Sequence, residues 1–115
     1  MDKKRFEELE KECKDAWSEL AKTGSSRKPE FLRKYVNWCP ACYITSLREN
    51  YYQECALCPI DIWRWRCSAA CEGLDDEELY GRWNNSLDPD ERRGLAAEIA
   101  ALKWTYLPEY EKFEE

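Results

Sequence analysis

The spacing of the cysteines constrains this chain more than any other feature. Six of its seven cysteines fall between residues 39 and 71. They form three pairs, Cys39-Pro-Ala-Cys42, Cys55-Ala-Leu-Cys58 and Cys67-Ser-Ala-Ala-Cys71. Two Cys-x-x-Cys pairs can bring four thiolates to one tetrahedral ion, which is how structural zinc is usually held. We therefore predict a Zn²⁺ site made by Cys39, Cys42, Cys55 and Cys58.

The third pair leaves the ligand set open. Cys67 and Cys71 can replace one of the other pairs, hold a second ion or remain buried thiols. A [4Fe–4S] cluster also accepts four thiolates, and Cys58-Pro59 is similar to the Cys-Pro that closes some ferredoxin motifs. The complete bacterial ferredoxin spacing is absent, so zinc is the first choice. An iron–sulfur protein that transfers electrons or senses redox state is the alternative.

Composition narrows the class of protein. At 115 residues the chain fits one domain, and 43% hydrophobic residues with six Trp and seven Tyr predict a folded core. The chain contains no His, which excludes mixed Cys/His zinc sites and the usual pairs of a nucleophile with a histidine. We therefore expect neither an enzyme nor a small-molecule substrate. We find no long apolar run or signal-like segment and expect a cytoplasmic protein, where Cys-rich motifs more often bind metal than form disulfides.

Apolar periodicity predicts a helix over 2–22, with steps of three and four along one buried stripe. Cys13 lies on this stripe, and we interpret it as a small core residue rather than a metal ligand. Two shorter helices are predicted over 29–37 and 43–52. The alternation of Trp and Arg near 60–66 predicts at most a short β segment.

Two further helices are predicted in the last third. The first of these helices should begin with the acidic residues 75–78 and end near Asn84 and Asn85. The second should begin at Asp88 and Pro89. The buried face of the second should run through Leu95, Ile99, Leu102 and Tyr106, before Pro108 ends the helix. The predicted fold class is mainly α: a small single helical domain over 1–115 organised around a Cys-rich zinc site. It divides into N-terminal helices (1–37), a Cys-rich metal-binding core (38–72) and acidic C-terminal helices (73–115).

The acidic charge is concentrated in the last third. The whole chain carries −6, and residues 72–115 carry thirteen acids against five bases. Such a surface repels phosphate backbones and attracts basic proteins, although a solvated acidic helix face has the same composition. We predict a partner protein with a basic surface. The candidate contact residues are Asp75, Asp76, Glu77, Glu78, Asp88, Asp90 and Glu91.

The preferred function is therefore a zinc-stabilised protein-binding module. We do not expect it to bind a membrane. A second alternative is a nucleic-acid-binding zinc module that uses Trp63, Arg64, Trp65 and Arg66, because aromatic rings stack on bases and guanidinium groups contact phosphates. Nucleic acid is disfavoured as a partner because the central third carries no net charge.

The order of motifs also carries a resemblance. Cys39/Cys42, Cys55/Cys58-Pro59-Ile60, Cys67 and Tyr80-Gly-Arg-Trp83 occur in the order found in small uncharacterised Cys-rich proteins of phages and prophages, which this chain resembles. The resemblance implies a compact metal-binding module. If the chain is phage-encoded, we expect it to act as an accessory or inhibitor of a host system in the host cytosol.

Overall fold

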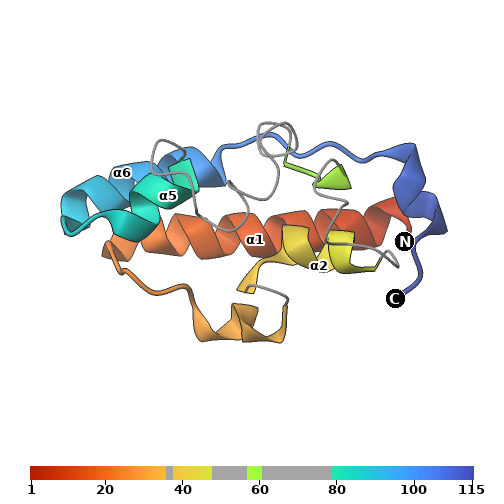
Figure 1. Cartoon of the computed structure of the whole chain (residues 1–115), viewed down its shortest axis with the longest axis horizontal. Coiled ribbons are helices and arrows are strands. Elements are labelled where there is room, and N and C mark those ends of the chain that lie inside the picture. The colour runs from red at the N-terminus through yellow and green to blue at the C-terminus, as the bar shows by residue number, and fades with distance from the viewer. Residues whose placement is uncertain (36–37, 48–56, 61–78) are drawn as a thin grey trace.

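The described part of the protein is mainly helical. The computed structural model describes residues 1–35, 38–47, 57–60 and 79–115 (Figure 1). Its elements are the α-helices α1 (Lys3–Thr23), α2 (Pro40–Ser46), α5 (Leu79–Asn85) and α6 (Pro89–Ala100), and the 3₁₀ helices η1 (Glu30–Lys34) and η5 (Pro108–Lys112). This confirms the prediction of a mainly α fold. Among these residues, no helix is both long enough and apolar enough to cross a membrane.

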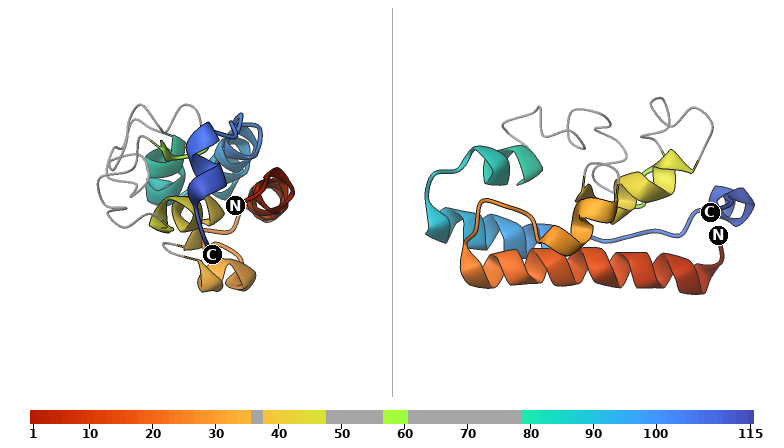
Figure 2. Two further views of the ribbon diagram at one scale, coloured as in Figure 1. Left: turned by 90° about the vertical axis from the view of Figure 1, so that its right-hand side faces the viewer. Right: turned by 90° about the horizontal axis from the view of Figure 1, so that it is seen from below.

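Helix α1 is the longest element and the one that the others pack against. Helix α6 runs antiparallel beside it, α5 packs on α6, and α2 contacts a different part of α1 (Figures 1 and 2). After α6 the chain returns along α1, so that η5 lies near the first turn of α1. The N-terminal amino group donates hydrogen bonds to the carbonyls of Tyr110 and Phe113 at this end.

Both ends of α1 are set by its sequence. The Asp2 carboxylate accepts a hydrogen bond from the backbone N–H of Arg5 at 2.8 Å, which satisfies one of the free donors of the first turn. Gly24 ends the helix in the left-handed conformation, with φ of 70°. The predicted stripe is buried as expected and consists of Phe6, Leu9, Cys13, Ala16, Trp17 and Leu20.

Aromatic side chains from later parts of the chain pack against α1 near both of its ends. Near its start, the ring of Phe6 lies 5.2 Å from that of Tyr106 and 5.6 Å from that of Tyr110. Near its end, the ring of Trp17 meets that of Trp83 edge-on at 4.9 Å. Such pairs add about 0.5–1.5 kcal/mol each beyond the burial of their area. These two sets of aromatic contacts hold the C-terminal segment and α5 against the same helix.

The last helix is shorter than predicted. Helix α6 ends at Ala100, so Leu102 and Tyr106 lie in the segment after it and not on a helical face. That segment pairs with the chain around residue 60: Trp104 forms an isolated antiparallel bridge with Ile60, and the N–H of Thr105 donates to the carbonyl of Pro59 at 2.9 Å. Here the backbone pairs with a distant segment instead of continuing the helix. The periodicity of apolar residues along the sequence cannot predict such pairing.

Other boundaries also differ from the predictions. The helix expected over 29–37 is the shorter η1, and the helix expected over 43–52 begins earlier, at Pro40, because proline suits the first helical position. The predicted end of α5 at Asn85 and the Asp88 cap of α6 are confirmed. Of the expected β segment near 60–66 only Ile60 belongs to the described residues.

Two glycines give a matched test of this packing. A Cβ on Gly24 would lie 2.9 Å from the backbone oxygen of Pro89, and its positive φ is strained for any L residue. A Cβ on Gly94, inside α6, would have no neighbouring atom within 4 Å. We expect Gly24→Ala to lower the free energy of unfolding by about 1–3 kcal/mol. Gly94→Ala should raise it by about 0.5–1 kcal/mol. Urea unfolding of both variants measures the two effects, and equal effects would contradict the α1–α6 contact.

Candidate metal centre

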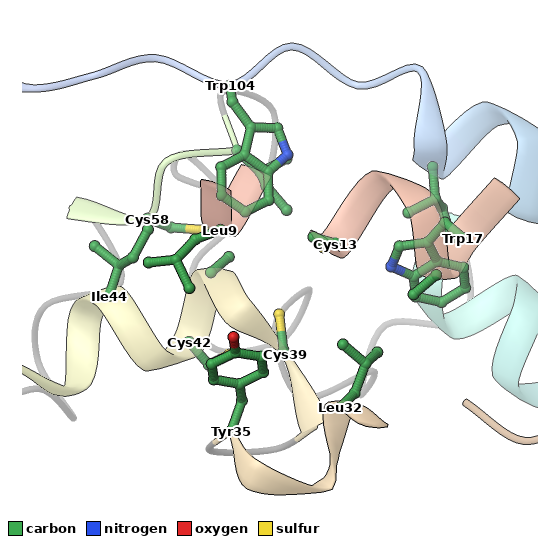
Figure 3. Close-up of a cluster of buried hydrophobic side chains, with 14 of the residues drawn as sticks. Leu9, Cys13, Trp17, Leu32, Tyr35, Cys39, Cys42, Ile44, Cys58 and Trp104 are labelled. Carbon is green, nitrogen blue, oxygen red and sulfur yellow. The ribbon is translucent and has the colours of Figure 1, made fainter. Parts of the chain in front are cut away.

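Four cysteines from three separate segments lie in the core beside the middle of α1. Cys13 comes from α1, Cys39 and Cys42 from the start of α2, and Cys58 from the segment 57–60 (Figure 3). Their exposed fractions are 2%, 8%, 8% and 1%, in that order. None of the four forms a disulfide. Chain segments that are distant in sequence therefore bury sulfur-bearing side chains in one hydrophobic core.

The first Cys-x-x-Cys pair is built into the N-terminal turn of α2. Cys39 is the residue before the helix, Pro40 takes the first helical position, and Cys42 lies in the first turn. The residue before Cys39, Trp38, has a φ of 54°, which is uncommon for a residue with a side chain and costs of order 1–3 kcal/mol. This left-handed residue separates η1 from α2 and directs the chain so that Cys39 faces α1.

Cys58 is held in place by the C-terminal segment. The hydroxyl of Tyr110 donates to the carbonyl of Leu57 at 2.5 Å, and the carbonyl of Pro59 accepts the N–H of Thr105. The residues on both sides of Cys58 are thus tied to the chain that follows α6. The position of Cys58 depends on the whole fold and not only on its own loop.

The thiols of Cys13 and Cys39 share a hydrogen bond. The bond to Cys39 raises the pKa of Cys13, with burial as the next cause, while the bonds from Cys13 and Cys42 lower the pKa of Cys39 against the opposing effect of burial. The backbone N–H of Cys42 also favours the Cys39 thiolate, although this contact does not reach the geometry of a side-chain helix cap.

A lysine lies near the thiols. Lys28 places its ammonium 4.7 Å from the ring centre of Tyr80 and 5.9 Å from that of Trp17. Its positive charge acts to lower the pKa of both Cys13 and Cys39. Negative charge on sulfur is thereby partly balanced inside the core.

The wall of the site on the η1 side is polar. The hydroxyl of buried Tyr35 donates to the carboxylate of Glu12, which also pairs with Lys34 at 3.1 Å. Figure 3 shows Tyr35 beside Cys39 and Cys42. Burial raises the pKa of Tyr35, and the hydrogen bond to Glu12 adds to this effect.

The structure places part of the predicted ligand set. Cys39, Cys42 and Cys58 share one core cluster, whereas Cys55, Cys67 and Cys71 lie outside the described residues. Within the described ranges, no three Cys, Asp or Glu side chains lie where together they could hold a metal ion, so neither a zinc nor an iron–sulfur site is shown. Sequence spacing did not predict the contact between Cys13 and Cys39. The only available signal was the place of Cys13 on the buried stripe of α1.

The residues predicted to contact a partner also lie partly inside and partly outside the described ranges. Asp75, Asp76, Glu77 and Glu78 are outside the described residues, as are Trp63, Arg64, Trp65 and Arg66. Asp88 uses its carboxylate to cap α6, accepting from the N–H of Asp90 at 3.0 Å. Asp90 forms an exposed ion pair with Arg93 at 2.5 Å, and Glu91 is exposed.

A large apolar side chain stands beside these acids. Leu87, in the turn between α5 and α6, is 96% exposed. The other large hydrophobic side chain exposed in the described ranges is Phe31, at 43%. Hydropathy patterning gave no indication that Leu87 would be so exposed.

Comparisons of the chain with protein families, with curated proteins and with solved structures gave no match. Its function is therefore inferred from the residues of this chain alone.

The Tyr35–Glu12 contact can be tested through the pH dependence of stability. An unfolded tyrosine loses its proton near pH 10 and the buried Tyr35 loses it later, so its contribution is present below about pH 10 and is lost as the pH rises. We expect Tyr35→Phe to cost about 1 kcal/mol at pH 8, and we expect this difference from the wild type to shrink by pH 11. Urea unfolding at both pH values measures it.

A matched control is Tyr43→Phe, which removes an exposed hydrogen bond to Glu115 at 2.8 Å and should cost less at pH 8. A Tyr35→Phe difference that stays constant from pH 8 to pH 11 would contradict the assignment.

Proposed function

We propose that this protein is a small zinc-stabilised module that binds another protein. The observation that carries the proposal is that three cysteines of the predicted ligand set, Cys39, Cys42 and Cys58, are all buried in the same hydrophobic core. Four thiolates fill the tetrahedral shell of Zn²⁺ and leave no open position for water or substrate. A site of this kind stabilises a fold and does not catalyse a reaction.

The size of the elements supports a stabilising role for metal. Helix α2 has seven residues, too few to be stable alone. A domain of this length also buries only part of the surface that its unfolded chain exposes, so its stability is marginal. A shared ion would attach α2 to the chain around Cys58.

The proposed binding surface is at the turn between α5 and α6. Leu87 offers an exposed apolar side chain, and Glu91 supplies negative charge beside it, whereas the charge of Asp90 is shared with Arg93. A partner that fits has an apolar pocket surrounded by Lys or Arg. Asp88 contributes less, because its carboxylate caps α6. In keeping with the phage-like order of motifs, we propose that the partner belongs to a host system.

Removal of the metal tests the first part of the proposal. Elemental analysis of protein purified without added metal should give about one Zn per chain, and a strong chelator should lower Tm by roughly 10 °C or more, because binding free energy is also folding free energy. Re-addition of Zn²⁺ should restore Tm. A metal-free protein that a chelator leaves unchanged would refute the proposal. A brown protein that contains iron and labile sulfide would instead indicate that an iron–sulfur cluster takes the place of zinc.

Substitution at the α5–α6 turn tests the second part. We expect Leu87→Glu to abolish capture of the partner while Tm changes by less than about 2 °C, because the side chain loses almost no buried area. Asp90→Asn/Glu91→Gln should weaken capture and make it less sensitive to salt. Quantitative mass spectrometry of proteins retained by each immobilised variant provides the measurement.

Matched variants control for changes of the same kind elsewhere. Phe31→Glu alters the other exposed apolar side chain, and Glu98→Gln/Glu109→Gln neutralises two exposed acids away from the turn. Both controls should retain the proteins that the wild type retains. Equal capture by the controls and by Leu87→Glu would remove the turn as the binding surface.

A further inference from the structure

The ammonium group of Lys28 lies against a cluster of aromatic rings from α1 and α5. It is over the face of Tyr80, 4.7 Å from the ring centre, and over the face of Trp17, at 5.9 Å. The ring of Trp83 completes the cluster, 4.9 Å from that of Trp17. We infer that this cluster is a binding site for a methylated ammonium group of a ligand, and that Lys28 is its internal competitor. The inference is independent of the proposed zinc site and of the α5–α6 turn.

The arrangement of the rings suits a cation. Aromatic faces carry negative electrostatic potential, and a cation within about 6 Å of a ring centre is attracted to the face. The planes of Trp17 and Tyr80 are inclined by 81°, with their centres 6.0 Å apart, so one compact cation contacts both faces. Trp17 and Trp83 are buried, whereas Tyr80 and Lys28 are half-buried. The cluster is therefore reached from solvent on the side of Tyr80 and Lys28.

Trp83 adds a hydrogen-bond donor to the cluster. Its ring centre lies 5.9 Å from that of Tyr80. Among the described side chains, its indole nitrogen Nε1 is the buried polar atom that has no hydrogen-bond partner. A buried donor without an acceptor is unfavourable, and a ligand that carries an oxygen near its ammonium group would supply the acceptor.

Lys28 belongs to an irregular segment, so its side chain can leave the rings without disturbing a helix. Residues 24–29 connect α1 to η1, and Ser25 hydrogen-bonds to its neighbours Thr23 and Arg27. A surface cavity of about 330 Å³ lies beside this segment, and Leu20, Thr23 and Lys28 are among the residues that line it. The cavity gives the lysine side chain room to move away from the cluster.

A ligand for this site must compete with a lysine of the same chain. The effective concentration of such an internal group is about millimolar or higher. A primary ammonium is compact and strongly hydrated, so it loses much of its hydration energy when it enters an aromatic site. Methyl groups spread the same charge over an apolar surface, and aromatic cages bind such groups well. A methylated ammonium group is therefore the occupant that best displaces Lys28.

Nuclear magnetic resonance of the unmutated protein tests the exchange directly. The ε-methylene protons of Lys28 should resonate upfield of those of the other lysines, because of the ring currents of Tyr80 and Trp17. Choline should move them to the ordinary lysine position and, with the same dissociation constant, shift the indole N–H signals of Trp17 and Trp83. The neutral analogue of choline, in which a carbon replaces the nitrogen, should cause neither change. Equal shifts with both compounds overturn the inference, as does the absence of shifts up to about 0.1 M choline, far above millimolar.

Variants measure the competition independently. Lys28→Ala should bind choline at least about tenfold more tightly than the wild type, because the internal competitor has been removed. In this background, Tyr80→Phe should keep the affinity and Tyr80→Ala should lower it about tenfold. Lys22→Ala removes an exposed lysine at the end of α1 and should bind choline like the wild type. Equal affinities of Lys28→Ala and the wild type, or an equal gain in Lys22→Ala, overturn the role of Lys28.

A peptide with one trimethyllysine distinguishes two sources of the methylated ammonium group. Tighter binding of the peptide than of choline assigns the site to a methylated lysine of a protein, and the reverse assigns it to a small molecule. The same peptide with unmodified lysine should bind at least about tenfold more weakly than the trimethylated one. Equal affinities of these two peptides overturn the choice of ligand.

Discussion

Burial of one face of α1 is the interaction on which the other elements depend. Each large apolar side chain on that face contributes about 1.5–3 kcal/mol when fully buried. The same stripe meets the C-terminal aromatics at Phe6, the thiols at Cys13 and α5 at Trp17. Three parts of the chain that do not follow one another in sequence are therefore ordered by one helix. Loss of that face would separate all three at once.

The thiol cluster and the proposed binding turn lie in different parts of this arrangement. The thiols face the middle of α1, whereas Leu87 lies beyond its C-terminal end, near Gly24 and the start of α6. Arg92 ties these parts together by donating to the carbonyls of Gly24 and Ser86 at 2.7 and 2.9 Å. The proposed metal and the proposed partner would thus be bound in separate parts of the molecule, connected by α1 and α6.

Local signals in the sequence were sufficient for α1 and for the beginning of α6. Steps of three and four identify the buried stripe of α1, and Asp88-Pro89 identifies the cap of α6, because both depend on residues within a few positions of one another. The end of α6 was not predictable in this way, since Trp104 pairs with Ile60 in a distant segment. The neighbour of Cys13 was missed for the same reason. Its contact with Cys39 is created by the packing of α2 on α1, which no spacing of cysteines encodes.

The edge-on contact of Trp17 with Trp83 has a spectroscopic consequence. Two indoles whose centres are 4.9 Å apart and inclined by 80° are close enough for their electronic transitions to couple. Coupled chromophores of this kind give a paired circular dichroism band that vanishes when either ring turns away. The contact between α1 and α5 therefore contains its own optical reporter, which needs no added label.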